Sequence, residues 1–259
     1  MIMCRVNPDV RAILHPCYIL HQRDYRETSK LLEVFSSEHG RISLVARGVK
    51  RKSYRNGHLL QINRKLDLAW SGRGDLCTLT NLESGYPVMD LRGRWLLSAF
   101  YVNELLLRLL HRHDAHTQLF LAYEQTLHAL QRGVNEEKVL RRFELELLRE
   151  LGYGPVLDHA IDTGRKVEPG RDYYFQVNQG PVEAASPGKD LIPVAGATLL
   201  ALACGELESP EAIRQTKRIM RGIIAQHLSG KPLASRKMYQ AYLGMAVQNG
   251  ESPETKSGS

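Results

Sequence analysis

The stretch GRISLVARGVKRK, residues 40–52, combines an apolar run with a cluster of cations. Its first half carries β-branched and apolar residues after a glycine, which predicts a strand over 41–47 that leaves a turn. Its second half is basic and contains a further glycine, which predicts a loop at the end of that strand. This strand and loop decide how the N-terminal part of the chain is interpreted.

Positive charge is concentrated around this loop. The segment 41–73 holds nine Lys and Arg residues and one acid, Asp67, whereas the whole chain of 259 residues has a net charge of +7. A basic, glycine-containing loop at a strand end suits phosphate groups, because each cation that neutralises a phosphate releases a counterion. A solvated, disordered hairpin tip is the alternative.

The pattern is typical of strands up to about residue 87. Short apolar or alternating runs are separated by turn residues and predict strands over 12–21, 29–36, 41–47, 59–70 and 76–83. Five short strands in so short a segment suit a closed barrel, which leaves no free sheet edge. We therefore predict an OB-fold β-barrel over residues 1–88.

Beyond residue 87 the apolar spacing becomes helical. Helices are expected over 91–111, 117–131, from Asn135 to Gly152, over 197–204, from Ser209 to before Gly230, and over 235–248. Glycine, proline and turn residues between 154 and 196 predict an irregular insert with one hairpin over 173–182. The expected fold class is α+β: the barrel, a mainly α-helical domain over 89–248 with this ribbon-like insert, and a disordered tail over 249–259.

The cysteines and the absence of long apolar runs narrow the class of protein. Cys4, Cys17, Cys77 and Cys204 form no Cys-x-x-Cys pair, which indicates a reduced protein without disulfides or a zinc finger. No run approaches the ~20 apolar residues of a membrane span, and the N-terminus lacks the apolar core of a signal peptide. We expect a cytoplasmic protein that does not bind membranes.

No catalytic motif is found. The sequence lacks a phosphate-binding P-loop, a Gly-x-Gly-x-x-Gly turn and a nucleophile elbow, so we predict no catalytic residues, no cofactor and no enzymatic activity. The segment His111–His116 holds three imidazoles and a carboxylate, which could bind zinc if the loop folded back on itself. A solvated loop between helices is favoured, with no metal ligand, and a metal-dependent hydrolase that uses this loop is a lesser alternative.

Two neighbouring arginines, Arg141 and Arg142, lie in the third helix beside leucines. In one interpretation they form intrahelical ion pairs, Arg141 with Glu144 and Arg142 with Glu146. In the other they bind the end of an acidic, apolar peptide through the fork-shaped guanidinium. The segment 230–237 is expected first of all to end one helix and begin the next, and in the second interpretation its cations would also extend the binding surface.

The chain resembles the bacterial recombination mediator family RecO over roughly residues 12–242. The similarity lies in a series of short blocks in order: DYRETS at 24–29, EHGR at 38–41 with VARG at 45–48, YVNELL at 101–106, RRFEL at 141–145 with LGYG at 151–154, and GKPLASR at 230–236. The order and spacing of the blocks make the resemblance specific.

This resemblance implies a nucleoid-associated protein that binds single- and double-stranded DNA and anneals complementary strands. It also implies contact with the acidic C-terminal tail of single-strand-binding protein, and cooperation with RecR to load RecA. The expected DNA-binding residues are Arg41, Arg47, Lys50, Arg51, Lys52 and Arg55, and the expected partner-binding residues are Arg141 and Arg142. An OB-fold protein that binds RNA is the main alternative.

One departure from the family concerns zinc. Many members carry two Cys-x-x-Cys pairs in the insert, whereas the corresponding positions here are Ala160 with Thr163 and Ala184 with Pro187. Thiolate ligands are absent, so the insert is expected to be held by ordinary packing.

Overall fold

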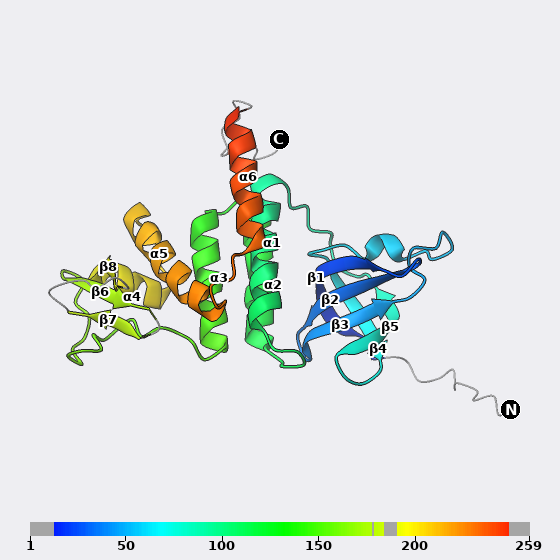
Figure 1. Ribbon diagram of the computed structural model, residues 1–259, viewed down its shortest axis with the longest axis horizontal. Coiled ribbons are helices and arrows are strands. Elements are labelled where there is room, and N and C mark those ends of the chain that lie inside the picture. Colours follow the sequence, from blue (N-terminus) through cyan, green and yellow to red (C-terminus); the bar gives the residue numbers. More distant parts are fainter. Residues whose placement is uncertain (1–12, 178, 184–190, 249–259) are drawn as a thin grey trace. The chain divides into compact units, whose positions relative to one another are not determined.

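The computed structural model describes residues 13–177, 179–183 and 191–248, and Figure 1 shows its elements along the chain. The chain forms two compact units. The barrel unit consists of Met1–Met89 and Leu110–Phe120, and the helical unit consists of Asp90–Leu109 and Leu121–Ser259. The tail expected over 249–259 lies outside the described residues.

The barrel unit contains a closed five-stranded barrel of the OB type. Its elements are β1 (His15–Tyr25), β2 (Ser29–Ser36), β3 (Gly40–Ala46), the 3-10 turn η1 (Gly57–Leu59), β4 (Lys65–Ser71) and β5 (Leu76–Glu83). The strand order is β1-β2-β3-β5-β4, and β4 pairs with β1 to close the barrel. β3 and β5 run parallel, while the other neighbours are antiparallel. The predicted OB-like barrel is confirmed.

The apolar alternation in the sequence explains the barrel core. Side chains at every second strand position share a face, and these positions are buried here. Leu32 and Val34 of β2 lie in the core with Ile42 and Leu44 of β3, and all four are at most 1% exposed. In the β2–β3 ladder Leu32 lies opposite Leu44 and Val34 opposite Ile42, so the pairing register brings the two apolar faces together.

Two strand boundaries lie four or more residues from the sequence prediction. β1 continues to Tyr25, beyond the expected end at residue 21, because the polar residues 22–25 pair with β2. The segment 59–64 is not a strand: Leu59 is the last residue of η1, and Asn63 adopts a positive φ of 65°. β4 therefore begins at Lys65.

The helical unit confirms the expected change to helical structure. Its helices are α1 (Gly93–Leu109), α2 (Thr117–Gln131, shared with the barrel unit at its start), α3 (Glu136–Glu150), α4 (Gly196–Cys204), α5 (Pro210–His227) and α6 (Ala234–Gln248). Together with the barrel they make the fold class α+β, as predicted. Among the described residues, no helix combines the length and apolar character that a bilayer span requires.

The predicted helix ends are formed by local hydrogen bonds. The Asn135 side chain accepts a hydrogen bond from the amide of Lys138 at 3.2 Å, and Ser209 Oγ accepts one from the amide of Ala212 at 3.0 Å. Gly152, with φ 76°, ends the last turn of α3. The two capping side chains satisfy backbone amides at the helix starts, and the glycine adopts the left-handed conformation that is common at a helix end.

The segment 154–196 is more regular than expected. β6 (Asp172–Gln176) pairs with β7 (Gly180–Val182), which confirms the predicted hairpin. β8 (Leu191–Ala195), which the sequence did not predict, adds a third strand on the other side of β6. Pro193 in β8 lacks an amide hydrogen, which an edge strand tolerates.

Apolar packing holds this insert together. Ala160 is fully buried in the same core cluster as Leu157 and Phe175. The Thr163 hydroxyl donates a hydrogen bond to Glu183 at 3.2 Å. Positions 160 and 163 therefore do not fit a zinc ion, which needs thiolate, imidazole or carboxylate ligands. The other two corresponding positions, Ala184 and Pro187, lie outside the described residues.

Candidate functional site

The basic loop, residues 47–57, is anchored to the barrel core. Val49 is 7% exposed and belongs to the core cluster, and Tyr54 packs against it. The amide of Lys50 donates a hydrogen bond to the carbonyl of Thr28 at 3.0 Å. The loop is therefore a packed element and not a disordered hairpin tip.

The predicted phosphate-binding cations of this loop differ in their surroundings. Arg47, Lys50, Arg51, Lys52 and Arg55 are all exposed. Lys50 differs from the others because it forms an ion pair, with its Nζ 2.7 Å from Oδ2 of Asp24. The hydrogen bond from Lys50 lowers the pKa of the Asp24 carboxyl. Part of the Lys50 charge is thus neutralised within the barrel unit, whereas the other four cations face solvent.

Arg41 lies away from the basic loop. It is near the start of β3, whereas Arg47 follows the end of that strand, so the two are roughly 20 Å apart at the usual rise per residue. Burial lowers the pKa of the Arg41 guanidinium, and nearby Glu33 opposes this effect. The carbonyl of Arg41 accepts a hydrogen bond from the amide of His113 at 3.1 Å. The structure does not bring Arg41 together with the other predicted cations.

A hollow of about 760 Å³, the barrel hollow, opens beside the basic loop. The β1–β2 turn, the end of β3 and the start of β5 surround it. Its lining residues are Tyr25, Arg26, Glu27, Thr28, Ser29, Val45, Arg47, Gly48, Arg51, Leu76 and Thr78. Three arginines therefore share this hollow with one acid, which gives it a surplus of positive charge.

Arg26 was not among the predicted contacts. It adopts a φ of 53°, which is uncommon for a residue other than glycine, and its guanidinium carbon lies 5.2 Å from the centroid of the Tyr25 ring. A cation beside an aromatic ring suits a nucleotide, because the ring can stack on a base and the cation can pair with a phosphate. The block DYRETS held the signal, but only the strand pairing shows that this turn reaches the basic loop.

Another basic residue of the charged segment 41–73 has a different environment. Lys65 Nζ lies 4.6 Å from the centroid of the Tyr86 ring and 5.8 Å from that of Tyr18. Such cation–π contacts keep the ammonium within the barrel unit. The high local charge of the sequence therefore overstates the number of cations available to a ligand.

A second cavity, of about 560 Å³, lies within the helical unit. It is bordered by α1, α3, α5, α6 and the segment before α6. The lining residues are Leu97, Ser98, Tyr101, Glu136, Glu137, Leu140, Arg141, Glu144, Lys217, Arg221, Ile224, Ala225, Leu228, Gly230, Lys231, Pro232, Leu233, Ser235, Arg236, Tyr239, Gln240 and Leu243. This helical cavity joins an apolar wall to five cations and three acids.

Arg141 is held at the wall of this cavity by a buried ion pair. It is 6% exposed, and its Nη2 lies 2.5 Å from Oε1 of Glu144. The Tyr101 hydroxyl donates to the same oxygen at 2.6 Å. Burial raises the pKa of Glu144, and the charge of Arg141 opposes that shift. The predicted intrahelical pair is confirmed, yet among the described residues Nε of Arg141 has no hydrogen-bond partner.

The other cations of the helical cavity differ in their surroundings: Lys217 is ion-paired, whereas Arg221 is repelled by two other arginines. Glu137 is ion-paired with Lys217. The pKa of Arg221 is lowered, first by burial and then by the positive charges of Arg236 and Arg141. An anion bound beside these arginines would relieve their mutual repulsion. Arg221 was missed in the sequence, although its place one turn after Lys217 on α5 put it on the same helix face.

Of the other cations that the sequence suggested for a partner surface, two in the segment 230–237 line the helical cavity and Arg142 does not. Arg142 is exposed, and it is not among the described residues that line the cavity. Glu146, its expected partner, lies 4.0 Å from Arg149. Lys231 and Arg236 do line the cavity, as the sequence suggested for this segment.

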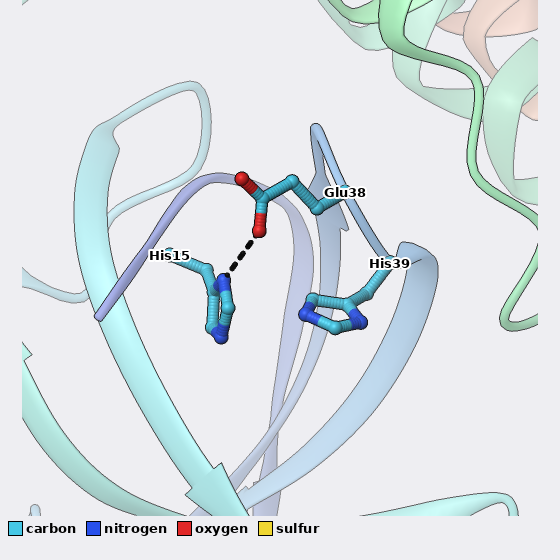
Figure 2. A group of neighbouring side chains, drawn as sticks. All are labelled: His15, Glu38 and His39. Atoms are coloured by element: carbon cyan, nitrogen blue, oxygen red, sulfur yellow. Dashed lines mark hydrogen bonds and ion pairs between the residues drawn. The ribbon is translucent and has the colours of Figure 1, made fainter. Parts of the chain in front are cut away.

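The imidazoles of the segment 111–116 do not converge on one point. Nε2 of His116 lies 3.3 Å from Oδ2 of Asp114, without a third ligand. Within the described ranges, one group of three His, Cys, Asp or Glu side chains has its ligand atoms close enough to share a metal ion. It consists of His15, Glu38 and His39, drawn in Figure 2.

Comparison with known proteins identifies the family. The model described as Recombination protein O N terminal matches residues 11–86, and the model described as Recombination protein O C terminal matches residues 93–237. The chain belongs to the RecO family. The resemblance to RecO inferred from the sequence blocks is therefore confirmed.

Several curated RecO proteins match nearly the whole chain. The DNA repair protein RecO of Nitrosococcus oceani is 46% identical over 231 residues, which cover 89% of this chain and 94% of the relative. That of Aromatoleum aromaticum is 42% identical over 225 residues, covering 86% and 93%. That of Methylococcus capsulatus is 41% identical over 231 residues, covering 89% and 94%. These RecO relatives are named as DNA repair proteins.

Proposed function

We propose that this RecO family member is a non-enzymatic recombination mediator that binds single- and double-stranded DNA through the barrel unit. The observation that carries this proposal is the barrel hollow, where Arg26, Arg47 and Arg51 lie with one acid. Cations that contact phosphates do not read bases, so binding is expected to be nearly independent of sequence and sensitive to salt.

Annealing follows from the same electrostatics. Two complementary strands repel each other through their phosphates, and the cations of the hollow and the basic loop reduce that repulsion. Base pairing then supplies the specificity. The exposed Lys52 and Arg55 are placed to extend the positive surface beyond the hollow. No covalent bond changes in this process, so no catalytic group is needed.

We further propose that the helical cavity binds the acidic C-terminal tail of single-strand-binding protein. Its apolar wall suits apolar side chains of a peptide, and Arg141, Arg221 and Arg236 suit carboxylates. Glu144 fixes the Arg141 guanidinium while Nε stays without a partner among the described residues. Part of the donor capacity of Arg141 is therefore unused, although Nε itself is buried in the cavity wall, so the more exposed Arg221 and Arg236 would make the first contacts with a peptide carboxylate.

Membership of the RecO family supports the remaining part of the proposal, in which the protein cooperates with RecR to load RecA onto DNA at the nucleoid. The tail contact would bring the protein to DNA coated by single-strand-binding protein. The barrel unit would then engage the strand.

Annealing of complementary strands coated with single-strand-binding protein tests this function. We expect the protein to accelerate annealing, and to lose most of that effect when the coating protein lacks its acidic tail. Equal rates with and without the tail would contradict the proposed recruitment. No acceleration on bare strands at low salt would contradict the proposed annealing. Competition between structured RNA and single-stranded DNA separates this function from RNA binding, because an RNA-binding protein would prefer the RNA.

A further inference from the structure

Three side chains with metal-ligating atoms meet at one end of the barrel (Figure 2). His15 begins β1, and Glu38 and His39 lie in the turn between β2 and β3. Cys17 pairs with Ser36 in the β1–β2 ladder, so the start of β1 lies beside this turn. Nδ1 of His15 is 3.0 Å from Oε2 of Glu38, and one ligand atom of each of the three residues lies within 4.8 Å of the others.

An aromatic residue supports both imidazoles. The Trp70 ring lies 5.1 Å from the His15 ring and 5.3 Å from the His39 ring, measured between centroids. The two imidazoles are nearly perpendicular, at 88°, with their centroids 4.4 Å apart. Trp70 itself packs against the barrel core, so it gives the group a fixed wall on one side.

The backbone of the turn is held at several points. The amide of Ser37 donates a hydrogen bond to the carbonyl of Pro16 at 3.4 Å, and the Thr117 hydroxyl donates to the carbonyl of Ser37 at 3.1 Å. Gly40 has a φ of 65°, and a Cβ there would lie 1.9 Å from the carbonyl oxygen of Asp114. Another part of the barrel unit is therefore packed directly on the turn, which limits how far Glu38 and His39 can move apart.

We propose that His15, Glu38 and His39 form a binding site for a borderline transition-metal ion, with Zn²⁺ as the preferred ion. Two imidazoles and one carboxylate are a known zinc ligand set that leaves a fourth position for water. In a tetrahedral site with metal–ligand bonds of about 2.1 Å, ligand atoms are about 3.4 Å apart. The ligand atoms here lie within 4.8 Å of one another, and rotation of the exposed Glu38 and His39 side chains would bring them to the separation of a tetrahedral site. The imidazoles disfavour Mg²⁺ and Ca²⁺, which prefer oxygen ligands.

The site is separate from the proposed DNA-binding surface. It lies at the start of β3, whereas the basic loop follows the end of that strand, roughly 20 Å away. The inference therefore does not depend on the proposed function. Because the ion would link the first residue of β1 to the β2–β3 turn, its binding is expected to stabilise the folded barrel as well.

Trp70 provides a direct test. The chain has two tryptophans, so a Trp95→Phe variant of the full-length, untagged protein leaves Trp70 as the reporter. We expect Co²⁺ to quench its fluorescence in a saturable titration with one equivalent, and Zn²⁺ to reverse the quenching. The visible absorption of bound Co²⁺ in the unaltered protein gives a second readout that needs no Trp95 substitution.

Matched substitutions decide whether these residues are the ligands. His15→Gln and His39→Gln should each weaken Co²⁺ and Zn²⁺ binding by about tenfold or more, since even the loss of a supporting group has that effect. His21→Gln and His58→Gln, at exposed barrel positions, should leave it unchanged. Absence of saturable binding, or equal losses in all four variants, would overturn the proposal and leave only the hydrogen bond between His15 and Glu38.

Discussion

The salt dependence of DNA binding should report the arginines of the barrel hollow. Replacement of Arg26, Arg47 and Arg51 together by alanine removes three cations that line one hollow with a single acid. Each phosphate contact contributes about 0.7 to the slope of log affinity against log salt for single strands and about 0.9 for duplex. The slope should therefore become shallower by about 2 units on single-stranded DNA and by about 3 on duplex.

Fluorescence anisotropy of a labelled oligonucleotide, titrated at several salt concentrations, measures this slope. Raising the salt from about 50 to about 200 mM weakens DNA binding by both proteins. With a slope difference of about 2 units on single-stranded DNA, the fold-loss of affinity should be roughly 16 times smaller for the variant than for the wild type. The same measurement on a random and a repetitive sequence should give equal slopes, because phosphates carry no sequence information.

The Lys50–Asp24 ion pair offers a matched control on the same surface. The double variant Lys50→Ala with Asp24→Asn removes one cation and one anion that already neutralise each other. Its slope should change by about 0.5 or less. A triple arginine variant with the wild-type slope would show that the hollow does not contact phosphates. An equal change in the control, which leaves the net charge unaltered, would show that disturbing this surface, rather than losing its cations, changes the slope.

Three further predictions concern the partner cavity, the barrel core and the cysteines. Arg236→Glu should weaken binding of an acidic C-terminal peptide at least tenfold, because it replaces a cation of the cavity with an anion that repels the peptide. Lys237 is not among the residues that line the cavity, so Lys237→Glu should leave binding unchanged. Isothermal titration measures both affinities, and equal effects would argue against this cavity. Leu44→Ala should lower the free energy of unfolding, measured by urea titration, by about 2–5 kcal/mol, because the substitution leaves a cavity at a fully buried position. A loss below about 1 kcal/mol would show that the barrel core does not depend on the Leu44 side chain. Burial raises the pKa of Cys17 to about 12 from its ordinary 9.0, so its thiol should resist iodoacetamide at pH 8 while the exposed Cys204 reacts; peptide mass spectrometry measures both, and rapid labelling of Cys17 in the folded protein would contradict the prediction. The stability that the protonated Cys17 thiol contributes is present below pH 9 and is lost as the pH rises toward 12.

Local patterns in the sequence predicted the elements whose causes are local. β2 and β5 have the expected bounds because alternation within a strand marks its buried face. The start of α3 at Asn135 and that of α5 at Ser209 depend on hydrogen bonds across three residues. Such signals need no knowledge of the rest of the fold.

Non-local contacts explain the differences. The polar end of β1 is a strand only because β2 pairs with it. β8 contains a proline, which argues against a strand when the segment is considered alone. The segment is a strand because it pairs with β6 at the edge of the sheet. Neither feature leaves a periodic apolar signal in its own segment.

The candidate sites show the same limit. The sequence locates the basic loop, but it does not show that Lys50 is paired with Asp24, 26 residues away, or that Arg26 joins Arg47 in one hollow. Likewise, His15 and His39 are separated by most of two strands. Their meeting depends on the register of the barrel.

The insert between α3 and α4, residues 154–196, contains neither cysteine nor methionine, so it has no sulfur atom. Its buried residues, such as Phe175 and Ala160, belong to an apolar cluster. Thiolate sites lose their ion when peroxides attack the sulfur. Residues 154–196 therefore present no thiol that an oxidant could inactivate.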